Sequence, residues 1–324
     1  MKVSVVIPTY NRAHSVVDAI RSVLGQRYTD LELIVVDDGS TDDTAVRVAA
    51  IGDRRLGYVR GRHEGVSVAR NLGVRHATGE LVAFLDSDDL WQPDKLTREV
   101  EILARYPDAD VVFSDLEKRH GDRVYASFMR ETAVFSRRLR GMSYPDGLRL
   151  EAREMHLCLL EEVPVKPSAL VVRRTAFDEV GGFDEAWTSS EDWEFLLRLA
   201  RSHRFVYLDR PLAVLFISPD SLHITDQSRG EEAMIQLLGR EARRLAGDRE
   251  AVAAVRRGLV TRTKHCAWHH IDHHRRARAC GVYLRGFART GDVGLLARAA
   301  ATWIPRSLQH SPNGPDHDPT FVRS

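Results

Sequence analysis

The first 115 residues alternate short apolar runs with amphipathic segments, and this alternation restricts the chain to few folds. The runs VSVVIPTY, LELIVVDD, RLGYVRG, ELVAFL and ADVVFS are mostly continuous and rich in β-branched residues, as buried strands are. Between the first two, Val16, Ile20 and Val23 share one helical face, and Gly25 ends that helix. Strand–helix alternation with short connections predicts an α/β domain whose mainly parallel sheet is flanked by helices.

Polar residues cluster where three of these predicted strands end. The clusters are Pro8–Asn11, Asp37–Asp38 and Asp86–Asp89. In sheets of this kind ligands bind at the carboxyl ends of the strands, so the three clusters should meet at one edge. The last cluster gathers three carboxylates within four residues, which repel one another unless a cation or a polar ligand holds them.

The acids of DSDD can bind a metal. Asp86 and Asp88 can share a hard divalent cation such as Mg2+ or Mn2+. Such a cation neutralises charge on a departing diphosphate, which is Lewis-acid catalysis. The alternative is an Asx-rich turn that caps the helix opening at Pro93, and for Asp89 alone this is at least as good an explanation.

Two further acidic clusters allow a binding or catalytic role. In VVDDGSTDDT, a carboxylate of Asp37 or Asp38 can accept from the N3–H of uracil or from a ribose hydroxyl, or it can cap a helix. In SSEDWEFLLRL, Glu191 and Asp192 begin a helix. Asp192 can take a proton from an incoming hydroxyl, although the helix dipole alone also stabilises acids there.

Five motifs together resemble one enzyme family. VSVVIPTYNR, ELIVVDDGSTDDT, GVSVARNLGVRHATGELVAFLDSDD, VGGFDE and SEDWEFLLRL stand in the order found in family 2 glycosyltransferases, over about residues 1–225. The resemblance implies a GT-A fold and an inverting transferase that uses a nucleotide-sugar donor. The resemblance also implies roles for individual residues: the nucleotide lies by Pro8, Thr9 and Asn11, and its nucleobase binds Asp38. By the same resemblance the donor lies near Arg70, and the DxD motif, Asp86 and Asp88, holds the ribose and the metal-bound diphosphate. The implied catalytic base is Asp192.

The expected reaction moves a sugar, UDP-linked by preference, to a hydroxyl of a glycan or lipid-linked acceptor in polysaccharide biosynthesis, with Mn2+ or Mg2+ as cofactor. Secondary site candidates are Asp37, Asp89, Glu191 and His223. Many relatives carry an Arg and a His in a YRxH pattern, where LFISPDSLHIT has Phe216 and Ser218. This departure leaves His223 as the candidate substitute and puts the diphosphate contacts of that loop in doubt.

Other functions fit the sequence less well. A haloacid-dehalogenase-like phosphatase also has a strand followed by Asp-x-Asp, but usually after an early strand, whereas this pair comes late. A dehydrogenase is disfavoured because no GxGxxG follows the first strand. A catalytically silent sugar-nucleotide-binding or scaffold subunit stays open, and donor binding without turnover would favour it.

The charge distribution suggests a division of the chain. We expect a GT-A nucleotide-sugar-binding and catalytic domain over residues 1–228, a basic helical C-terminal extension over 229–308 and a disordered tail over 309–324. Residues 231–324 carry 16 Lys+Arg against 9 Asp+Glu, and the remainder carries 31 against 37. A basic extension can contact the anionic inner face of a membrane or simply be a solvated helical face. The acidic body argues against nucleic acid binding.

The remaining features concern location and metal chemistry. The N-terminus does not resemble a signal peptide, no apolar stretch approaches the roughly 20 residues of a membrane span, and three scattered cysteines suit a reducing cytoplasm. In TKHCAWHHIDHH, three histidine pairs are four residues apart and can bind zinc on a helix: His265/His269, His269/His273 and His270/His274. A basic amphipathic helix is the favoured alternative. Nothing in the sequence indicates the oligomeric state.

Overall fold

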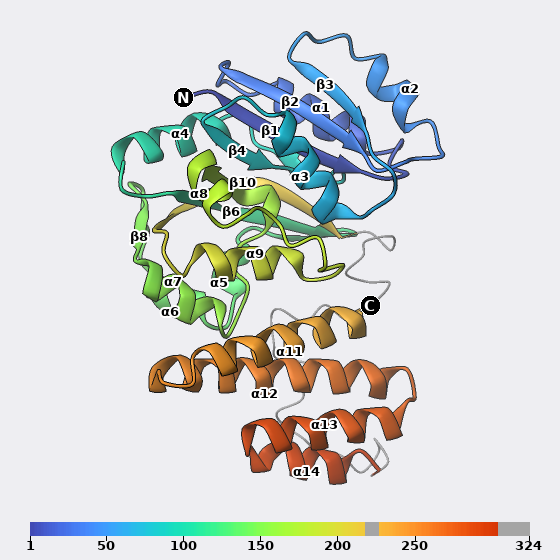
Figure 1. Cartoon of the computed structure of the whole chain (residues 1–324), viewed down its shortest axis with the longest axis vertical. Coiled ribbons are helices and arrows are strands. Elements are labelled where there is room, and N and C mark those ends of the chain that lie inside the picture. Colours follow the sequence, from blue (N-terminus) through green and yellow to red (C-terminus); the bar gives the residue numbers. More distant parts are fainter. Residues whose placement is uncertain (218–226, 304–324) are drawn as a thin grey trace. The chain divides into compact units, whose positions relative to one another are not determined.

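The computed structural model describes residues 1–217 and 227–303 (Figure 1). The chain divides into two compact units. The first consists of Met1–Arg130, Leu139–His156 and Val163–Ile217, and the second contains Glu131–Arg138, Leu157–Glu162 and the C-terminal helices. The expected domain boundaries at residues 228 and 308 stay predictions, and the expected tail over 309–324 lies outside the described residues.

A ten-stranded sheet forms the centre of the first unit, and the predicted α/β class is confirmed. Eight strands follow the order β3-β2-β1-β4-β9-β6-β10-β5, while β7 pairs with β6 and β8 pairs with β10. Strands β3, β2, β1 and β4 run parallel. Strand β9 lies antiparallel between β4 and β6, and β10 pairs with β6 in parallel. Strands β6 and β10 therefore run in the same direction as β4, so the sheet is mainly parallel, as expected, with antiparallel strands added to it. The strands are β1 Val3–Thr9, β2 Leu31–Asp37, β3 Leu56–Arg60, β4 Leu81–Phe84, β5 Leu90–Trp91, β6 Val111–His120, β7 Arg123–Tyr125, β8 Leu148–Leu150, β9 Leu170–Arg173 and β10 Phe205–Ile217.

Helices cover both faces of the sheet, and strands such as β1 and β2 are therefore buried on both sides. On one face, alternate residues of β1 such as Val5 pack with the apolar stripes of α1 and α4. On the other face, α3 approaches so closely at Gly73 that a Cβ there would lie 2.3 Å from Cγ1 of Val6. The helices of this unit are α1 Val16–Leu24, α2 Thr44–Ala49, α3 Val66–His76, α4 Lys95–Arg105, α5 Phe128–Glu131, α7 Ala152–Leu159, α8 Arg174–Glu179 and α9 Glu191–Leu199. Helix α6 Phe135–Leu139 belongs almost wholly to the second unit.

Two segments differ from the sequence-based expectation. The stretch DGLRLEAREMHLCLLEEV has a helical pattern throughout, but Leu148–Leu150 forms β8 and only the following residues form α7. Strand β8 pairs with β10, which buries Leu150. The run FVYLDRPLAVLF, which forms β10, fits either a strand or a bent hairpin. It is one strand whose register shifts around Pro211, because proline lacks the N–H that a regular ladder needs.

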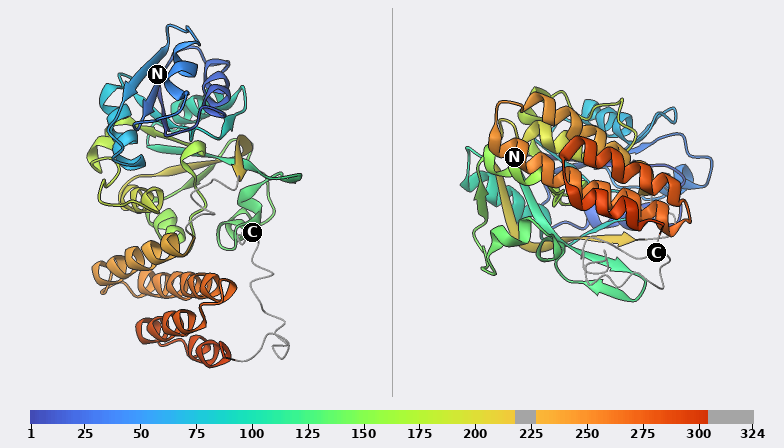
Figure 2. Two further views of the ribbon diagram at one scale, coloured as in Figure 1. Left: turned by 90° about the vertical axis from the view of Figure 1, so that its right-hand side faces the viewer. Right: turned by 90° about the horizontal axis from the view of Figure 1, so that it is seen from below.

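Four successive helices make up most of the second unit, and each packs against the next (Figure 2). They are α11 Gln227–Arg244, α12 Arg249–Asp272, α13 Arg276–Thr290 and α14 Val293–Ala301. Asp248 and Asp292 cap α12 and α14 by accepting from backbone N–H groups of the first turn. Across residues 1–217 and 227–303, no helix combines the length and the apolar character needed to span a bilayer.

Candidate functional site

The carboxyl ends of β1, β2 and β4 bring together the polar clusters that the sequence analysis identified. Thr9 of β1 pairs in parallel register with Asp37 of β2, and Asp38 N–H donates to the Thr9 carbonyl at 2.8 Å. On the other side of β1, Leu85 N–H donates to the Val6 carbonyl at 3.1 Å, immediately before Asp86. The predicted convergence at one sheet edge is therefore confirmed.

Asn11 holds the loop after β1 to the loop after β2. Its backbone has a left-handed φ of 50°, and its N–H donates to the Ser40 hydroxyl at 2.9 Å. Its side-chain oxygen accepts from Thr41 N–H at 2.8 Å. Nearby, Pro8 and Thr9 are buried in β1, and the Thr9 hydroxyl has no hydrogen-bond partner among the described residues. A buried hydroxyl without a partner costs stability, so Thr9 offers a free polar group at this edge.

Asp37 and Asp38 have different surroundings. Asp37 is fully buried and accepts from Ser40 N–H at 2.7 Å and from the Tyr58 hydroxyl at 2.5 Å. Burial and this carboxylate together raise the pKa of Tyr58 to about 12. Asp38 accepts from the N–H groups of Glu64 and Gly65 at 2.9 and 2.8 Å. Asp37 therefore fixes the turn after β2, and Asp38 shapes the loop that leads into α3.

Arg70 of α3 connects the Asp86 loop to helix α9. It is 3% exposed and donates to the Asp86 carboxylate and to the Glu191 carboxylate, both at 2.8 Å. Its guanidinium lies 5.1 Å from the centre of the Phe183 ring. Burial alone would lower the pKa of Arg70, but Asp86 and Glu191 outweigh burial and raise it. The buried cation thus links the DxD motif to the ED motif, which consists of Glu191 and Asp192.

The three acids after β4 are not equivalent. Asp89 is buried and accepts from the Ser168 hydroxyl at 2.5 Å and from Phe216 N–H at 3.2 Å, so it holds the loop together. The Asp88 side chain is 26% exposed and lies 3.8 Å from the Arg12 guanidinium. Burial and the neighbouring Asp86 raise the pKa of Asp88, which marks a site of concentrated negative charge.

The acidic loop has the donor set that a hard divalent cation prefers. Asp86 and Asp88 both offer carboxylate oxygens and are partly exposed at the sheet edge. Burial and the charges of Asp86 and Asp88 raise the pKa of Asp89 well above its usual range, so the three acids repel one another. A bound cation would relieve that repulsion, and the residues therefore fit a divalent metal.

Helix α9 begins at the ED motif. Ser190 precedes it with a left-handed φ of 59°, and Glu191 is turned to Arg70. The pKa of Glu191 is raised overall, because burial and the neighbouring Asp192 together outweigh the opposing effect of Arg70. Asp192 is half-buried, and one of its carboxylate oxygens accepts from Trp193 N–H at 2.8 Å. The first turn thus separates a structural acid from the acid predicted to be the base.

Two contacts at this edge involve residues that the sequence analysis did not single out. The rings of Tyr10 and His63 stack with centroids 4.1 Å apart, and His63 lies 4.0 Å from the Asp38 carboxylate. Tyr10 lies between Thr9 and Asn11, which the family resemblance places by the nucleotide, and this position in the sequence could have identified it as a site residue. Ser168 had no signal, because only the fold places it beside Asp89. His223, the candidate substitute in the YRxH region, lies outside the described residues.

The chain belongs to glycosyl transferase family 2, whose model matches residues 4–180, more than half of the chain. The match covers the strands and loops that build this edge of the sheet, up to α8. It ends before Glu191 and Asp192 at the start of α9, so the membership rests on the motifs within residues 4–180.

Several curated relatives match about a third of the chain. An uncharacterized glycosyltransferase of Rickettsia conorii is 44% identical over 103 residues, which are 32% of this chain and 17% of the relative. The UDP-Glc:alpha-D-GlcNAc-diphosphoundecaprenol beta-1,3-glucosyltransferase WfgD of Escherichia coli is 38% identical over 104 residues, 32% of this chain and 41% of WfgD. The matched region is thus a small part of the first of these relatives.

Solved structures resemble the chain over a greater length. TarS of S. aureus in complex with UDP has a TM-score of 0.58 at 22% identity, over 82% of this chain and 72% of that chain. The mannosyltransferase PcManGT of Pyrobaculum calidifontis, in complex with GDP-Man and Mn2+, has a TM-score of 0.59 at 22% identity, over 94% and 81%. At this identity the likeness shows the fold alone, and it confirms the GT-A-like architecture.

Proposed function

We propose that the chain is an inverting glycosyltransferase that moves a sugar from a nucleoside-diphosphate sugar, by preference a UDP-sugar, to a hydroxyl of a glycan or lipid-linked acceptor. The observation that carries this proposal is the Arg70 bridge between Asp86 and Glu191. It joins the acidic loop expected to hold the donor to the helix turn that carries the expected base. The residues proposed for the two halves of a transfer reaction are therefore neighbours, which supports the proposal.

The nucleotide is assigned to the loops after β1 and β2. The preformed Asp38 loop and the Thr9 hydroxyl supply an acceptor and a donor for hydrogen bonds to a base or ribose. The partly exposed Tyr10–His63 stack supplies an aromatic surface for the base. Asn11 holds the two loops together, so the site is formed before a ligand arrives.

The diphosphate is assigned to Asp86 and Asp88 together with a divalent cation, Mn2+ or Mg2+. When bound, the cation supplies Lewis-acid neutralisation of the leaving diphosphate. Arg70 fixes the Asp86 carboxylate through a hydrogen bond of 2.8 Å, and Arg12 stands 3.8 Å from Asp88. The chain thereby orients the acids while leaving Asp88 partly exposed.

Asp192 is assigned as the general base. It accepts the proton of the acceptor hydroxyl as that oxygen forms a bond to the anomeric carbon. The bond between the anomeric carbon and the diphosphate oxygen breaks, and the nucleoside diphosphate leaves with the electron pair. A single in-line displacement inverts the anomeric configuration and needs no nucleophilic residue. Glu191 is held by Arg70, which leaves Asp192 as the acid of the pair available for this step.

Calorimetry with a panel of nucleoside diphosphates tests the donor site, with Mn2+ present and after chelation. Wild type should bind one nucleotide, UDP by preference, in a metal-dependent manner. The Asp88→Asn variant should lose this metal-dependent binding. The Asp192→Asn variant should bind the nucleotide like wild type but turn over about 10²- to 10⁴-fold more slowly with a competent donor and acceptor, the range that a general base contributes.

Each outcome separates the competing functions. Absence of binding to every nucleotide, or metal-independent binding that survives Asp88→Asn, would contradict the proposed donor site. Metal-dependent binding without turnover on any glycan or lipid-linked acceptor would favour the catalytically silent sugar-nucleotide-binding subunit instead.

The acceptor side includes a proposed contact with the inner face of a membrane. Exposed apolar residues at helical spacing lie on α14 and just after it: Val293, Leu296 and Trp303. Exposed arginines on α13 include Arg285 and Arg289. The second unit therefore exposes both apolar and basic side chains, a combination that suits the surface of a membrane that carries anionic lipid, where a lipid-linked acceptor would be anchored.

A further inference from the structure

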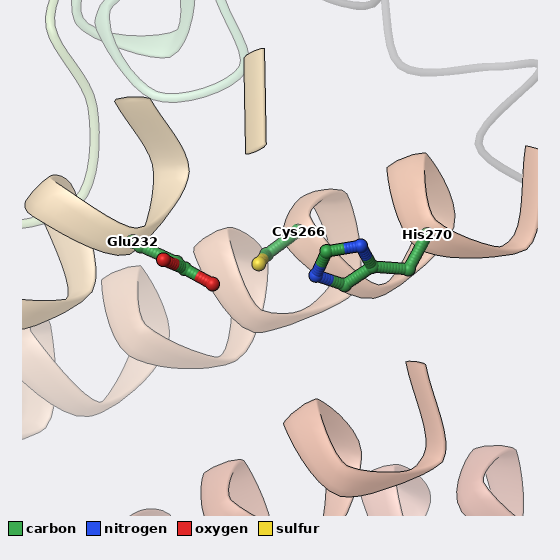
Figure 3. A group of neighbouring side chains, drawn as sticks. All are labelled: Glu232, Cys266 and His270. Carbon is green, nitrogen blue, oxygen red and sulfur yellow. The ribbon is translucent and has the colours of Figure 1, made fainter. Parts of the chain in front are cut away.

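Helices α11 and α12 bring three potential metal ligands together inside the second unit (Figure 3). Cys266 and His270 are four residues apart on α12 and therefore share one face. Glu232 projects from α11 toward them, and the sulfur, a ring nitrogen and a carboxylate oxygen all lie within 4.8 Å of one another. Cys266 and His270 are buried, whereas Glu232 is exposed, so the cluster opens to solvent on the Glu232 side.

The chemistry of this set is that of a zinc site. Thiolate, imidazole and carboxylate are all zinc ligands, and three protein ligands leave a fourth position for water. Bond lengths to zinc imply ligand atoms about 3.5 Å apart in a tetrahedral site. The present separations exceed that by about 1.3 Å at most, and rotamer adjustment of the exposed Glu232 side chain can shorten its distances to Cys266 and His270.

Two of the three histidine pairs expected from the sequence, His265/His269 and His269/His273, have a member engaged elsewhere. His265 Nδ1 lies 3.5 Å from the Glu231 carboxylate, which also accepts from Arg262 at 3.2 Å. His273 Nδ1 lies 2.8 Å from the His269 carbonyl oxygen. The fold therefore selects a set that includes a cysteine and a residue from another helix, and neither was visible in the spacing of the histidines.

Two features oppose metal binding and set its affinity. Burial and the nearby Glu232 and Glu231 raise the pKa of Cys266 to about 12, so the metal must displace a proton from sulfur. Arg275, Arg278 and Arg285 lie near enough to His270 to disfavour a further cation. The negative charges of Glu232 and of the thiolate that forms on binding counter both effects.

We propose that Glu232, Cys266 and His270 bind a zinc ion that joins α11 to α12. The site differs in kind from the acidic loop at Asp86 and Asp88, because a thiolate and an imidazole favour zinc whereas carboxylates alone favour Mn2+ or Mg2+. The zinc links two helices that are covalently connected only through the turn at residues 245–248, so its binding should stabilise their packing. Its loss should loosen α11 against α12.

The test uses the full chain carrying Asp88→Asn, which removes the acidic loop as a competing metal site. Titration with Co2+ should produce a thiolate-to-cobalt charge-transfer absorption that saturates at one equivalent and is abolished by Zn2+. The variants Cys266→Ser, His270→Gln and Glu232→Gln should each bind zinc at least about 100-fold more weakly, since loss of an outer-shell partner alone costs 10- to 100-fold. Zinc should also raise the melting temperature of the parent but not of these variants.

Two matched controls make the result specific. Cys280→Ser removes the half-exposed cysteine of α13, and His274→Gln removes an exposed histidine of the same stretch; both should bind zinc like the parent. Circular dichroism checks that every variant is folded, and His270→Gln and Glu232→Gln keep the test decisive if Cys266→Ser does not fold. Absence of the charge-transfer band, or its survival in Cys266→Ser, would overturn the proposal. Nucleotide binding by the chain with an intact Asp88 is a separate readout and does not depend on this site.

Discussion

Arg70 is the residue on which the candidate site most depends. Its guanidinium is buried and serves two carboxylates at 2.8 Å each. Arg70→Ala leaves Asp86 and Glu191 without their cation, so we expect a loss of about 3–5 kcal/mol in the free energy of unfolding, the range for a broken buried ion pair. Urea unfolding of the full chain measures this. Arg21→Ala, which removes an exposed arginine of α1, is the control and should cause little change.

Arg70→Lys refines the same prediction. Lysine keeps the charge but lacks the planar fork that reaches two carboxylates, so stability should lie between wild type and Arg70→Ala. Metal-dependent nucleotide binding should weaken in both variants, because Asp86 loses its fixed orientation. A stability of Arg70→Ala equal to that of Arg21→Ala would show that the bridge does not contribute as the geometry indicates.

Glu32 of β2 gives a pH dependence. Burial acts to raise its pKa, but hydrogen bonds from Lys2, Ser4 and Thr78 outweigh burial and lower the pKa to about 2, from an ordinary 4.5. Its contribution to stability is therefore complete above about pH 4.5 and is lost as the pH falls toward 2. Glu32→Gln should be less stable than wild type at neutral pH, and the gap should narrow across this window. Unfolding free energies of both proteins at several pH values provide the comparison, and a constant gap would contradict the assignment.

The site residues divide according to how local their signals are. Asp86 and Asp88 follow a strand in a recognisable motif, and the Asp192 position follows from the helix start and the family resemblance. Arg70 was placed near the donor, but its bridge to Glu191 spans 121 residues of sequence and could not be derived from spacing. The structural role of Asp89 could not be predicted, because its hydrogen-bond partners, the Ser168 hydroxyl and the Phe216 backbone N–H, are brought to it only by the tertiary fold.

At the level of elements, the close approach of α3 to the sheet makes a measurable prediction. A Cβ on Gly73 would lie 2.3 Å from one methyl of Val6 and 3.1 Å from a methyl of Val36. Gly73→Ala should therefore destabilise the first unit by about 1–3 kcal/mol through overpacking, despite the better helix propensity of alanine. Gly239→Ala in α11 is the matched control, because nothing lies within 4 Å of the added Cβ. That variant should be about 0.5–1 kcal/mol more stable, and urea unfolding compares the two.

Element types were predictable where hydrophobic periodicity is strong. The alternating strands and helices up to β6 follow their β-branched runs and helical stripes, and α4 and α9 follow theirs. Strand β8 was missed because Leu148–Leu150 stands next to a helical pattern and becomes a strand only by pairing with β10. The antiparallel β9 was also invisible, because a strand run does not state its direction. Direction depends on the path of the chain between strands, which is long here.

At the level of the whole molecule, the basic, partly apolar C-terminal helices make a prediction about membranes. The full chain should cosediment with vesicles that contain anionic phospholipid, less with neutral vesicles, and less at high salt because salt screens the arginines. Trp303→Ser should weaken binding to anionic vesicles, since the tryptophan is 59% exposed and suits the interface. Equal cosedimentation with both vesicle types would argue against an electrostatic contact, and none with either would argue against the membrane contact itself.

One consequence of the Arg70 bridge concerns how substitutions combine. Two acids held by one guanidinium are thermodynamically coupled through it, even though they belong to motifs more than 100 residues apart. A double-mutant cycle on Asp86→Asn and Glu191→Gln should therefore be non-additive, both in unfolding free energy and in nucleotide affinity. Natural variation at either acid would then be constrained by the other, so the nucleotide side and the acceptor side of the site could not diverge independently.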